Sequence, residues 1–292
     1  LRWVLLFGLR FLGALRWIAE VLAVAAFGWG AYPPNAGTDA YREAVARWMG
    51  RRYAVDSERM DLAARIVAAN GSRSALFMLA LLAANSRDAR WKPIVLLPDP
   101  FFHAYEAAAV FAGAEARFLP LDAEGAPQLD QVAAEDWPRV AMIYVCAPSN
   151  PAGLTPSLDS LRAILRTART HRALAVFDEC YSEIWRGAPP AGALEACAAE
   201  GPGEDGDVLD GAAIINSLSK RASAPGRRGG FLCAAKPLAE DFAALVARGG
   251  APAPAPIQAV GAALWNDDAH VAAARAHYDA AFAAAAPVLT PP

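Results

Sequence analysis

The sequence has few cysteines, and they do not form a metal-binding pattern. Four cysteines occur in 292 residues, without metal-ligand spacing. Cys146, Cys180 and Cys233 lie in or beside apolar runs that are typical of a core. We therefore expect reduced thiols in a cytoplasmic protein, and no metal among its cofactors.

The chain also lacks an excess of charge of either sign. Its formal net charge is −3 at pH 7, so the sequence gives no polyelectrolyte pattern and predicts no nucleic-acid partner. A hydrophobic fraction of 55% and a charged fraction of 20% are typical of a globular protein rather than a disordered one. The length suffices for one large α/β domain and part of a second.

Uninterrupted apolar runs are too short for a transmembrane helix. Residues 1–31 are strongly apolar, but Arg10, Arg16 and Glu20 interrupt them. No stretch therefore approaches the roughly 18 apolar residues that a spanning helix needs. The segment has neither an initiating Met nor the small-residue cleavage site of a signal peptide. We expect no membrane partner.

Apolar runs of strand length alternate with helical stretches along the rest of the chain. The predicted strands are 94–98, 116–121, 140–146, 173–179, 212–217 and 229–234. The predicted helices are 74–85, 103–113 and 158–171. This alternation predicts a mostly parallel sheet with helices on both faces. Residues 187–211, rich in glycine, proline and acidic residues, are predicted to form a surface excursion.

The most informative run is SLSKRASAPGRRGGF, residues 217–231. It combines Lys220, whose amine can form an imine, with Arg228 and glycines that can surround a phosphate. Pyridoxal 5′-phosphate (PLP) requires both, since it is held as a Schiff base of a lysine and carries a phosphate dianion. A lysine after serines is by itself more often a residue of a solvated loop.

Further motifs precede this run in a fixed order. They are NGSRSALF (70–77), DPFFHAY (99–105), APSNPAGLTP (147–156) and FDECYSEI (177–184). In this order ahead of SLSK, they resemble the fold-type I aminotransferases of class I/II. The opening YPPNAGTDAYREAVARWM (32–49) extends the resemblance. Among the subfamilies, SLSKR and PFFHAYEAAAVFAGAE (100–115) most resemble bacterial N-succinyldiaminopimelate aminotransferase.

The resemblance implies an α/β fold of the PLP-dependent transferase fold type I. The expected large PLP-binding domain covers residues 32–250, and residues 251–292 are expected to start a truncated small domain. Residues 1–31 form an N-terminal apolar segment, in which we expect a helix within 17–28 and assign no role to residues 1–16. The family's Gly-Glu-Pro stretch and the arginine that clamps the substrate α-carboxylate are not found. We therefore expect a fragment or a truncated gene product.

The resemblance assigns catalytic roles to three residues, Lys220, Asp178 and Tyr181. Lys220 is implied to hold the cofactor and to carry a proton between the substrate Cα and the cofactor. Asp178 follows an apolar run, so we expect it at the carboxyl end of a buried strand, where it can keep the pyridine nitrogen protonated. Glu179 and Glu183 compete for this role, but only Asp178 matches the family position, and we predict that the other two form a helix- or turn-facing pair.

Further residues match cofactor-binding positions of the family. Tyr181 and Asn150 are implied to hydrogen-bond the phenolate oxygen, and Asn150 also to meet the substrate carboxylate. Asn150 alone would favour a plain Asn-Pro turn, and the order of the motifs reverses that preference. Phe102 matches the aromatic residue that stacks on the pyridine ring, although it could equally belong to the core. Tyr32 matches a tyrosine that reaches the phosphate of the neighbouring subunit, which implies a homodimer.

The phosphate is implied to lie at the start of the helix predicted over 74–85. A helix N-terminus presents unpaired N–H groups, and glycine allows a close approach. The residues implied to contact the phosphate are Gly71, Ser72, Arg73, Ser217 and Arg228. Arg227 is adjacent to Arg228, but the spacing of eight from Lys220 selects Arg228.

The implied activity is transfer of an amino group between an amino acid and a 2-oxo acid. The favoured pair is N-succinyl-LL-2,6-diaminopimelate, an intermediate of lysine biosynthesis, and 2-oxoglutarate. Two alternatives stay open: another fold-type I PLP enzyme, such as a lyase, and a truncated, catalytically silent PLP-binding protein. Sequence beyond Pro292 that supplies a carboxylate-clamping arginine would favour catalysis over the silent alternative.

Overall fold

The computed structural model describes residues 32–87, 90–250 and 252–289 of the chain. Residues 1–31 lie outside this described part, and with them the helix expected within 17–28 and the segment 1–16. Within the described part, no helix is both long and apolar enough to cross a membrane.

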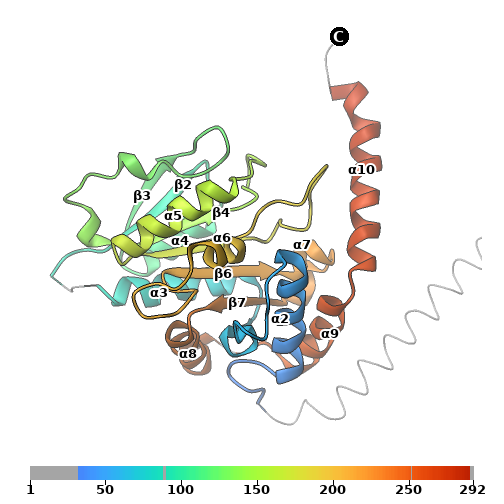
Figure 1. Cartoon of the computed structure of the whole chain (residues 1–292), viewed down its shortest axis with the longest axis horizontal. Coiled ribbons are helices and arrows are strands. Elements are labelled where there is room, and N and C mark those ends of the chain that lie inside the picture. Colours follow the sequence, from blue (N-terminus) through green and yellow to red (C-terminus); the bar gives the residue numbers. More distant parts are fainter. Residues whose placement is uncertain (1–31, 88–89, 251, 290–292) are drawn as a thin grey trace, which may run out of the picture.

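A seven-stranded sheet forms the centre of the described chain (Figure 1). In spatial order its strands are β1 (Ile66–Ala69), β7 (Gly230–Ala234), β6 (Ala212–Ser217), β5 (Leu174–Asp178), β4 (Val140–Cys146), β2 (Ile94–Asp99) and β3 (Glu115–Pro120). The strands from β6 to β3 pair in parallel, whereas β7 is antiparallel to both β6 and β1. The predicted mostly parallel sheet is therefore confirmed, and every predicted strand is present with ends shifted by at most one residue. The sequence analysis missed β1.

Helices and short turns connect these strands. The α-helices are α2 (Asp39–Tyr53), α3 (Ser72–Asn85), α4 (Ala104–Phe111), α5 (Leu158–Thr170), α6 (Ala193–Glu200), α7 (Leu218–Arg221), α8 (Lys236–Leu245), α9 (Ala255–Asn266) and α10 (Ala269–Leu289). The 3-10 turns are η1 (Leu62–Arg65), η2 (Leu129–Gln131), η3 (Trp137–Arg139) and η4 (Pro225–Arg227), and η5 (Val246–Gly250) is a π-helical turn.

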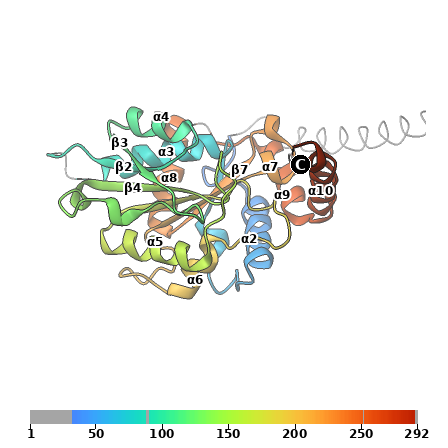
Figure 2. The same cartoon turned by 90° about the horizontal axis from the view of Figure 1, so that it is seen from above.

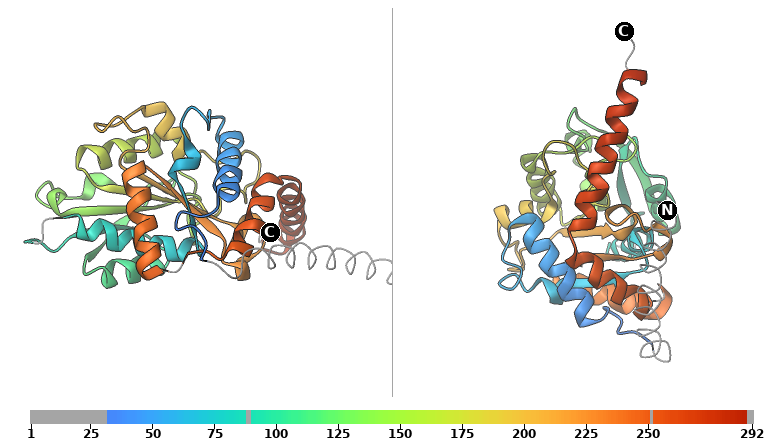
Figure 3. Two further views of the ribbon diagram at one scale, coloured as in Figure 1. Left: turned by 90° about the horizontal axis from the view of Figure 1, so that it is seen from below. Right: turned by 90° about the vertical axis from the view of Figure 1, so that its right-hand side faces the viewer.

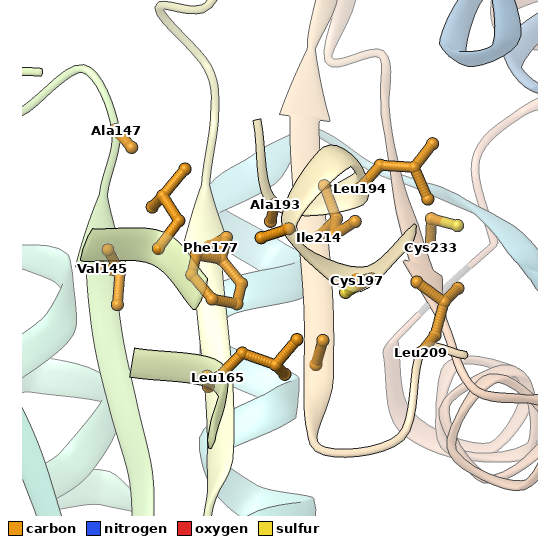
Figure 4. Close-up of a cluster of buried hydrophobic side chains, with 14 of the residues drawn as sticks. Val145, Ala147, Leu165, Phe177, Ala193, Leu194, Cys197, Leu209, Ile214 and Cys233 are labelled. Carbon is orange, nitrogen blue, oxygen red and sulfur yellow. The ribbon is translucent and has the colours of Figure 1, made fainter. Parts of the chain in front are cut away.

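Two hydrophobic cores cover the two faces of the sheet. Successive side chains of a strand point to opposite faces, so Phe177 of β5 packs in the core beneath α5 and α6, whereas its neighbour Val176 packs beneath α3 and α4. Figure 2 shows these two helix layers on either side of the sheet. Figure 4 shows Phe177 between Val145 of β4 and Ile214 of β6. Burying one such ring contributes about 1.5–3 kcal/mol to stability.

The segment 187–211 differs from the predicted surface excursion, because it contains α6. Leu194 and Cys197 of this helix are fully buried against the core on the α5 face. Gly192 and Gly201 bound the helix, and Gly201 has a positive φ of 74° that suits a helix end. The short run ALEACAAE therefore contributes to the core although glycine, proline and acidic residues surround it.

At the C-terminus, α9 joins the core whereas α10 projects from it. Trp265 of α9 is fully buried, with its ring centroid 4.6 Å from that of Trp48 of α2. The Trp265 indole donates to the Tyr41 hydroxyl at 3.2 Å, and that hydroxyl donates to the Gly230 carbonyl at 2.8 Å. The right-hand view of Figure 3 shows α10 rising away from the sheet, and Val271 is its buried residue.

Glu179 and Glu183 lie at the turn after β5, but their side chains are buried rather than exposed on it. Glu179 accepts hydrogen bonds from the Tyr53 hydroxyl at 2.5 Å and from the Ala193 N–H at 2.6 Å. It thereby joins the end of α2 and the start of α6 to the end of β5. Burial raises the pKa of Glu179 to about 7.

Glu179 should make the stability of the fold depend on pH. Its folded-state pKa of about 7 lies above the ordinary value of 4.5, so the folded chain binds this proton more tightly than the unfolded chain does. The resulting stabilisation is complete below about pH 4.5 and is lost as the pH rises through 7. Compared with Glu179→Gln, the wild type should lose up to about 3 kcal/mol of unfolding free energy between pH 4.5 and pH 8. Urea denaturation of the wild type and of Glu179→Gln at both pH values measures the two unfolding free energies. An equal change with pH in both chains would contradict the prediction.

Candidate active site

A pocket of about 210 Å³ lies where parallel strands end at one edge of the sheet. Cys146 is the last residue of β4, and Asp178 is the last residue of β5. The two residues are register partners in the sheet, and both line the pocket. The full lining is Ser72, Arg73, Phe102, Cys146, Asn150, Asp178, Cys180, Tyr181, Ser219, Lys220, Pro225 and Arg228. The site residues predicted from the sequence all line this pocket except Gly71, Ser217 and Tyr32.

Asp178 forms the buried, acidic end of the pocket. Its Oδ2 accepts from the Tyr105 hydroxyl at 2.8 Å, and its Oδ1 accepts from the Cys180 N–H at 3.2 Å. Burial raises the pKa of Asp178, and hydrogen bonds from the Cys180 side chain, the Tyr105 hydroxyl and the Cys180 N–H oppose the rise. The sequence analysis missed Tyr105, although it lies in the DPFFHAY motif, because only the fold brings α4 beneath the end of β5. The Tyr105 ring stacks on that of Tyr144 at a centroid distance of 4.3 Å.

Lys220 lies on the short helix α7, directly after β6. Ser217 caps this helix: its hydroxyl accepts from the Ser219 N–H at 3.1 Å and donates to the Gly229 carbonyl at 3.1 Å. Ser217 is therefore buried and fixes the turn, whereas Ser219, which the sequence analysis did not select, lines the pocket. The Lys220 Nζ lies 5.5 Å from the centroid of the Tyr181 ring.

Three cations that form no ion pair with a described residue line the pocket. Among the described residues, no carboxylate forms an ion pair with Arg73, Lys220 or Arg228. A Cβ at position 71 would overlap the Arg228 guanidinium, so Gly71 lets that group approach the start of α3. Ser72 is the first residue of α3 and contributes the positive end of its dipole. Together these groups favour an anion such as a phosphate.

Of the remaining predicted residues, Asn150, Tyr181 and Phe102 line the pocket, and Tyr32 lies on the surface. Asn150 and Tyr181 are half-buried in the pocket wall, and burial raises the pKa of the Tyr181 hydroxyl. Phe102 also lines the pocket, with the Arg73 guanidinium 5.5 Å from its ring centroid. Tyr32 is 97% exposed and does not line the pocket, and neither does Arg227.

The cysteines are all buried and free. Burial raises the pKa of both Cys146 and Cys180, so the two thiols in the pocket wall are neutral near pH 7. No cluster of three or more His, Cys, Asp or Glu side chains able to hold a metal ion occurs in residues 32–87, 90–250 and 252–289.

Comparison with known proteins identifies the family. The sequence pattern described as aminotransferase class I and II matches residues 14–285. The chain belongs to this family. A Mycobacterium tuberculosis protein designated a probable aminotransferase is 32% identical over 272 residues, which are 93% of this chain and 59% of that protein. LL-diaminopimelate aminotransferase 2 of Trichormus variabilis is 32% identical over 203 residues, 68% of this chain and 48% of that protein.

Solved structures show the same fold. An aminotransferase from Neisseria meningitidis has a TM-score of 0.81 and 30% identity, covering 93% of this chain and 65% of that chain. N-succinyldiaminopimelate aminotransferase from Mycobacterium tuberculosis has a TM-score of 0.70 and 27% identity, covering 90% and 65%. The fold-type I family predicted from the sequence is therefore confirmed. The chain spans about half to two thirds of the length of these relatives.

Aminotransferases of class I and II use pyridoxal 5′-phosphate, and the pocket suits this group. The buried Asp178 can face a protonated ring nitrogen, Lys220 offers an amine, and the cations beside Gly71 can face a phosphate. When bound, the cofactor supplies a carbonyl carbon that reacts with amines and a ring that accepts electron density from the substrate Cα.

Tyr105→Phe should destabilise the fold in a pH-dependent manner. It removes the hydroxyl hydrogen bond to the buried Asp178 and should cost about 1–3 kcal/mol of unfolding free energy at neutral pH. The folded-state pKa of Asp178 is already raised and should rise further, so the loss should shrink as acidification protonates the carboxyl.

Tyr144→Phe is the matched control, because its hydroxyl donates to the Leu76 carbonyl at 2.8 Å rather than to Asp178. The unfolding free energy that Tyr144→Phe loses, measured by urea denaturation, should be the same at pH 4 and at pH 8. If the loss in Tyr105→Phe were also independent of pH, the Tyr105 hydroxyl would not support the ionised Asp178.

Proposed function

We propose that the protein is a PLP-dependent aminotransferase that moves an amino group between an amino acid and a 2-oxo acid. One observation carries the proposal: a single pocket joins Lys220, the buried Asp178 and the cations Arg73 and Arg228, which have no carboxylate partner among the described residues. An amine, a buried anion and an anion-binding group are the three elements that this cofactor requires.

Lys220 and Asp178 have the central roles in this proposal. Lys220 holds the cofactor through its amine and, once that amine is released, moves a proton at the substrate Cα. Asp178 holds a proton on the ring nitrogen, which strengthens the ring as an acceptor of electron density. Tyr105, through its hydrogen bond, keeps the Asp178 carboxylate oriented.

The other lining residues position the cofactor. Asn150 and Tyr181 donate hydrogen bonds to the ring oxygen and favour its ionised form. Phe102 lies against the ring face. Arg228, Arg73 and the N-terminus of α3 at Ser72 bind the phosphate, Gly71 leaves room for this contact, and Ser217 acts through the turn that it caps.

For the substrates we propose N-succinyl-LL-2,6-diaminopimelate as amino donor and 2-oxoglutarate as acceptor, in lysine biosynthesis. Two kinds of relative support a diaminopimelate-type donor: the LL-diaminopimelate aminotransferases at 30–32% identity and the N-succinyldiaminopimelate aminotransferase among the structural neighbours. They share a long amino-acid substrate with a second polar end.

We also propose a homodimer in which Tyr32 reaches the phosphate of the partner subunit. The Tyr32 side chain is almost fully exposed, and it lies outside the pocket of its own chain. Both features suit a residue that acts on a second copy. If the two subunits share their sites, a mixture of Tyr32→Phe and Lys220→Ala chains should regain function. In each mixed dimer, one site then combines an intact Lys220 from one chain with an intact Tyr32 from the other.

Lys220 should carry the cofactor. The chain has three lysines, Lys92, Lys220 and Lys236, and Lys236 is engaged with Asp61 at 2.6 Å. Borohydride reduction of the cofactor-loaded chain, followed by peptide mapping, should place the pyridoxyl group on Lys220. Lys220→Ala should lose the label but retain part of the affinity through the phosphate and ring contacts. Labelling of Lys92 or Lys236 instead would overturn the assignment.

Asp178→Asn should keep the cofactor but slow the chemistry. The variant retains the size of the side chain and loses the anion that holds the ring proton. The rate of the half-reaction with an amino donor should fall by roughly 100- to 1,000-fold or more, while the absorbance of the bound cofactor persists. Glu179→Gln removes the neighbouring buried carboxyl outside the pocket and should leave that rate nearly unchanged. A near-normal rate in Asp178→Asn would refute the role.

A further inference from the structure

A cavity of about 570 Å³ lies at the edge of the sheet opposite the cofactor pocket. The strand β5 begins at this cavity with Leu174 and ends at the cofactor pocket with Asp178. Ala141 of β4 and Ala212 of β6, both at the amino ends of their strands, also line the cavity. We call it the amino-edge cavity. A strand of five residues, roughly 15 Å long, separates it from the cofactor pocket.

The floor of the amino-edge cavity is apolar. Leu82 of α3, Leu174 of β5 and Leu238 of α8 line it, and each is only partly buried by the core against which it packs. An aliphatic chain bound there would remove this leucine surface from water, which is favourable. The floor therefore suits methylene groups.

The rim of the same cavity is acidic. Five carboxylates and two guanidinium groups line it, so its formal net charge is −3. The carboxylates are Glu204, Asp205, Asp207, Asp210 and Asp241, and the guanidinium groups are those of Arg169 and Arg172. A concave surface lined by an excess of one sign of charge attracts ligands of the opposite sign.

Two of the five carboxylates already have a cationic partner. Asp207 forms a largely buried ion pair with Arg65. The closest oxygen of Glu204 lies 3.7 Å from a nitrogen of Arg172, and both side chains are 82% exposed. Neither carboxylate is therefore needed to explain an affinity for a further cation.

Arg169 fixes the loop that carries the other carboxylates. Its three guanidinium nitrogens donate to the backbone carbonyls of Gly201, Val208 and Asp210, each at 2.9 Å. These acceptors are neutral carbonyls, so Arg169 holds the loop against α5 without forming an ion pair with its side chains. The rim of the cavity is thus held in place by the folded chain itself.

Three carboxylates remain without a cation. Among the described residues, no lysine, arginine or histidine forms an ion pair with Asp205, Asp210 or Asp241. Burial raises the pKa of the half-buried Asp210, the charge of Asp205 raises it further, and Arg169 opposes the rise. Two like charges therefore stand close together at this rim, and a bound cation would relieve their repulsion.

These unpaired carboxylates stand on both sides of the sheet edge. Asp210 lies beside α5, which packs in the core on one face, and its neighbour Leu209 belongs to the same core. Asp241 belongs to α8, whose residues Ala239 and Phe242 pack in the core on the other face. The apolar floor of the cavity lies between the two sides.

We infer that the amino-edge cavity is a binding site for an aliphatic amine that carries two ammonium groups. The methylene chain lies on the leucine floor, one ammonium group meets Asp205 and Asp210, and the other meets Asp241. Complementary charge at both ends and apolar contact between them select this class of ligand over inorganic cations and over simple alcohols. The inference does not depend on the proposed function, because the cavity shares no residue with the cofactor pocket.

The test is titration calorimetry with three probes that share a five-carbon chain. 1,5-Diaminopentane carries two ammonium groups, pentylamine carries one and 1-pentanol carries none. The chain is loaded with PLP and reduced with borohydride first, so that the added amines cannot react with the cofactor. The diamine should bind roughly 10-fold or more tightly than pentylamine, and pentylamine more tightly than pentanol. A chain that does not load PLP can be titrated directly, so failure of the proposed function leaves this test intact.

Three variants locate the site. Asp241→Asn, on an exposed side chain, should lower the affinity for the diamine to that for pentylamine, and Asp210→Asn should act in the same direction. Glu240→Gln removes the neighbouring exposed carboxylate of α8, which does not line the cavity, and should change nothing. Equal affinities for the diamine and pentylamine in the wild type would overturn the inference. So would a preference for the diamine that survives both aspartate variants, or a loss in Glu240→Gln as large as in Asp241→Asn.

Discussion

Parallel pairing of β4 with β5 is the constraint on which the site depends. Because parallel strands end at one edge, Cys146 and Asp178 reach that edge together, and the loops after them carry Asn150 and Tyr181. The antiparallel strand β7 then returns beside β6, which places Gly230 against the start of α3. The turn between these two strands carries Lys220 and Arg228. One sheet edge thus gathers groups that lie far apart in the sequence.

Beneath this edge, a buried charge network fixes the segments that surround the pocket. Glu183, two residues after Tyr181, accepts from Arg52 of α2 and from Arg221, the residue after Lys220. The Arg221 guanidinium lies 5.2 Å from the ring centroids of both Trp48 and Trp265. Removing one partner of such a network leaves a buried charge uncompensated, which is strongly destabilising. The network therefore holds α2, α7 and the turn after β5 together behind the pocket.

The sequence predicted the long elements and most of the pocket, and the omissions have physical reasons. Strands such as Val140–Cys146 are continuous apolar runs, whereas β1 has four residues and depends on pairing with a strand more than 160 residues away. Tyr105 and Ser219 became visible only when the fold brought α4 and α7 to the strand ends. The burial of Glu183 depends on arginines from two distant helices, which no local pattern indicates.

The central claim is that the cations beside Gly71 bind the phosphate of PLP while Lys220 and Asp178 hold the rest of the molecule. It is tested most directly by absorbance titration of the chain with PLP and with pyridoxal, which lacks the phosphate. Two charge-assisted arginine contacts predict that PLP binds about 100-fold or more tightly than pyridoxal. Equal affinities for the two compounds would contradict the account.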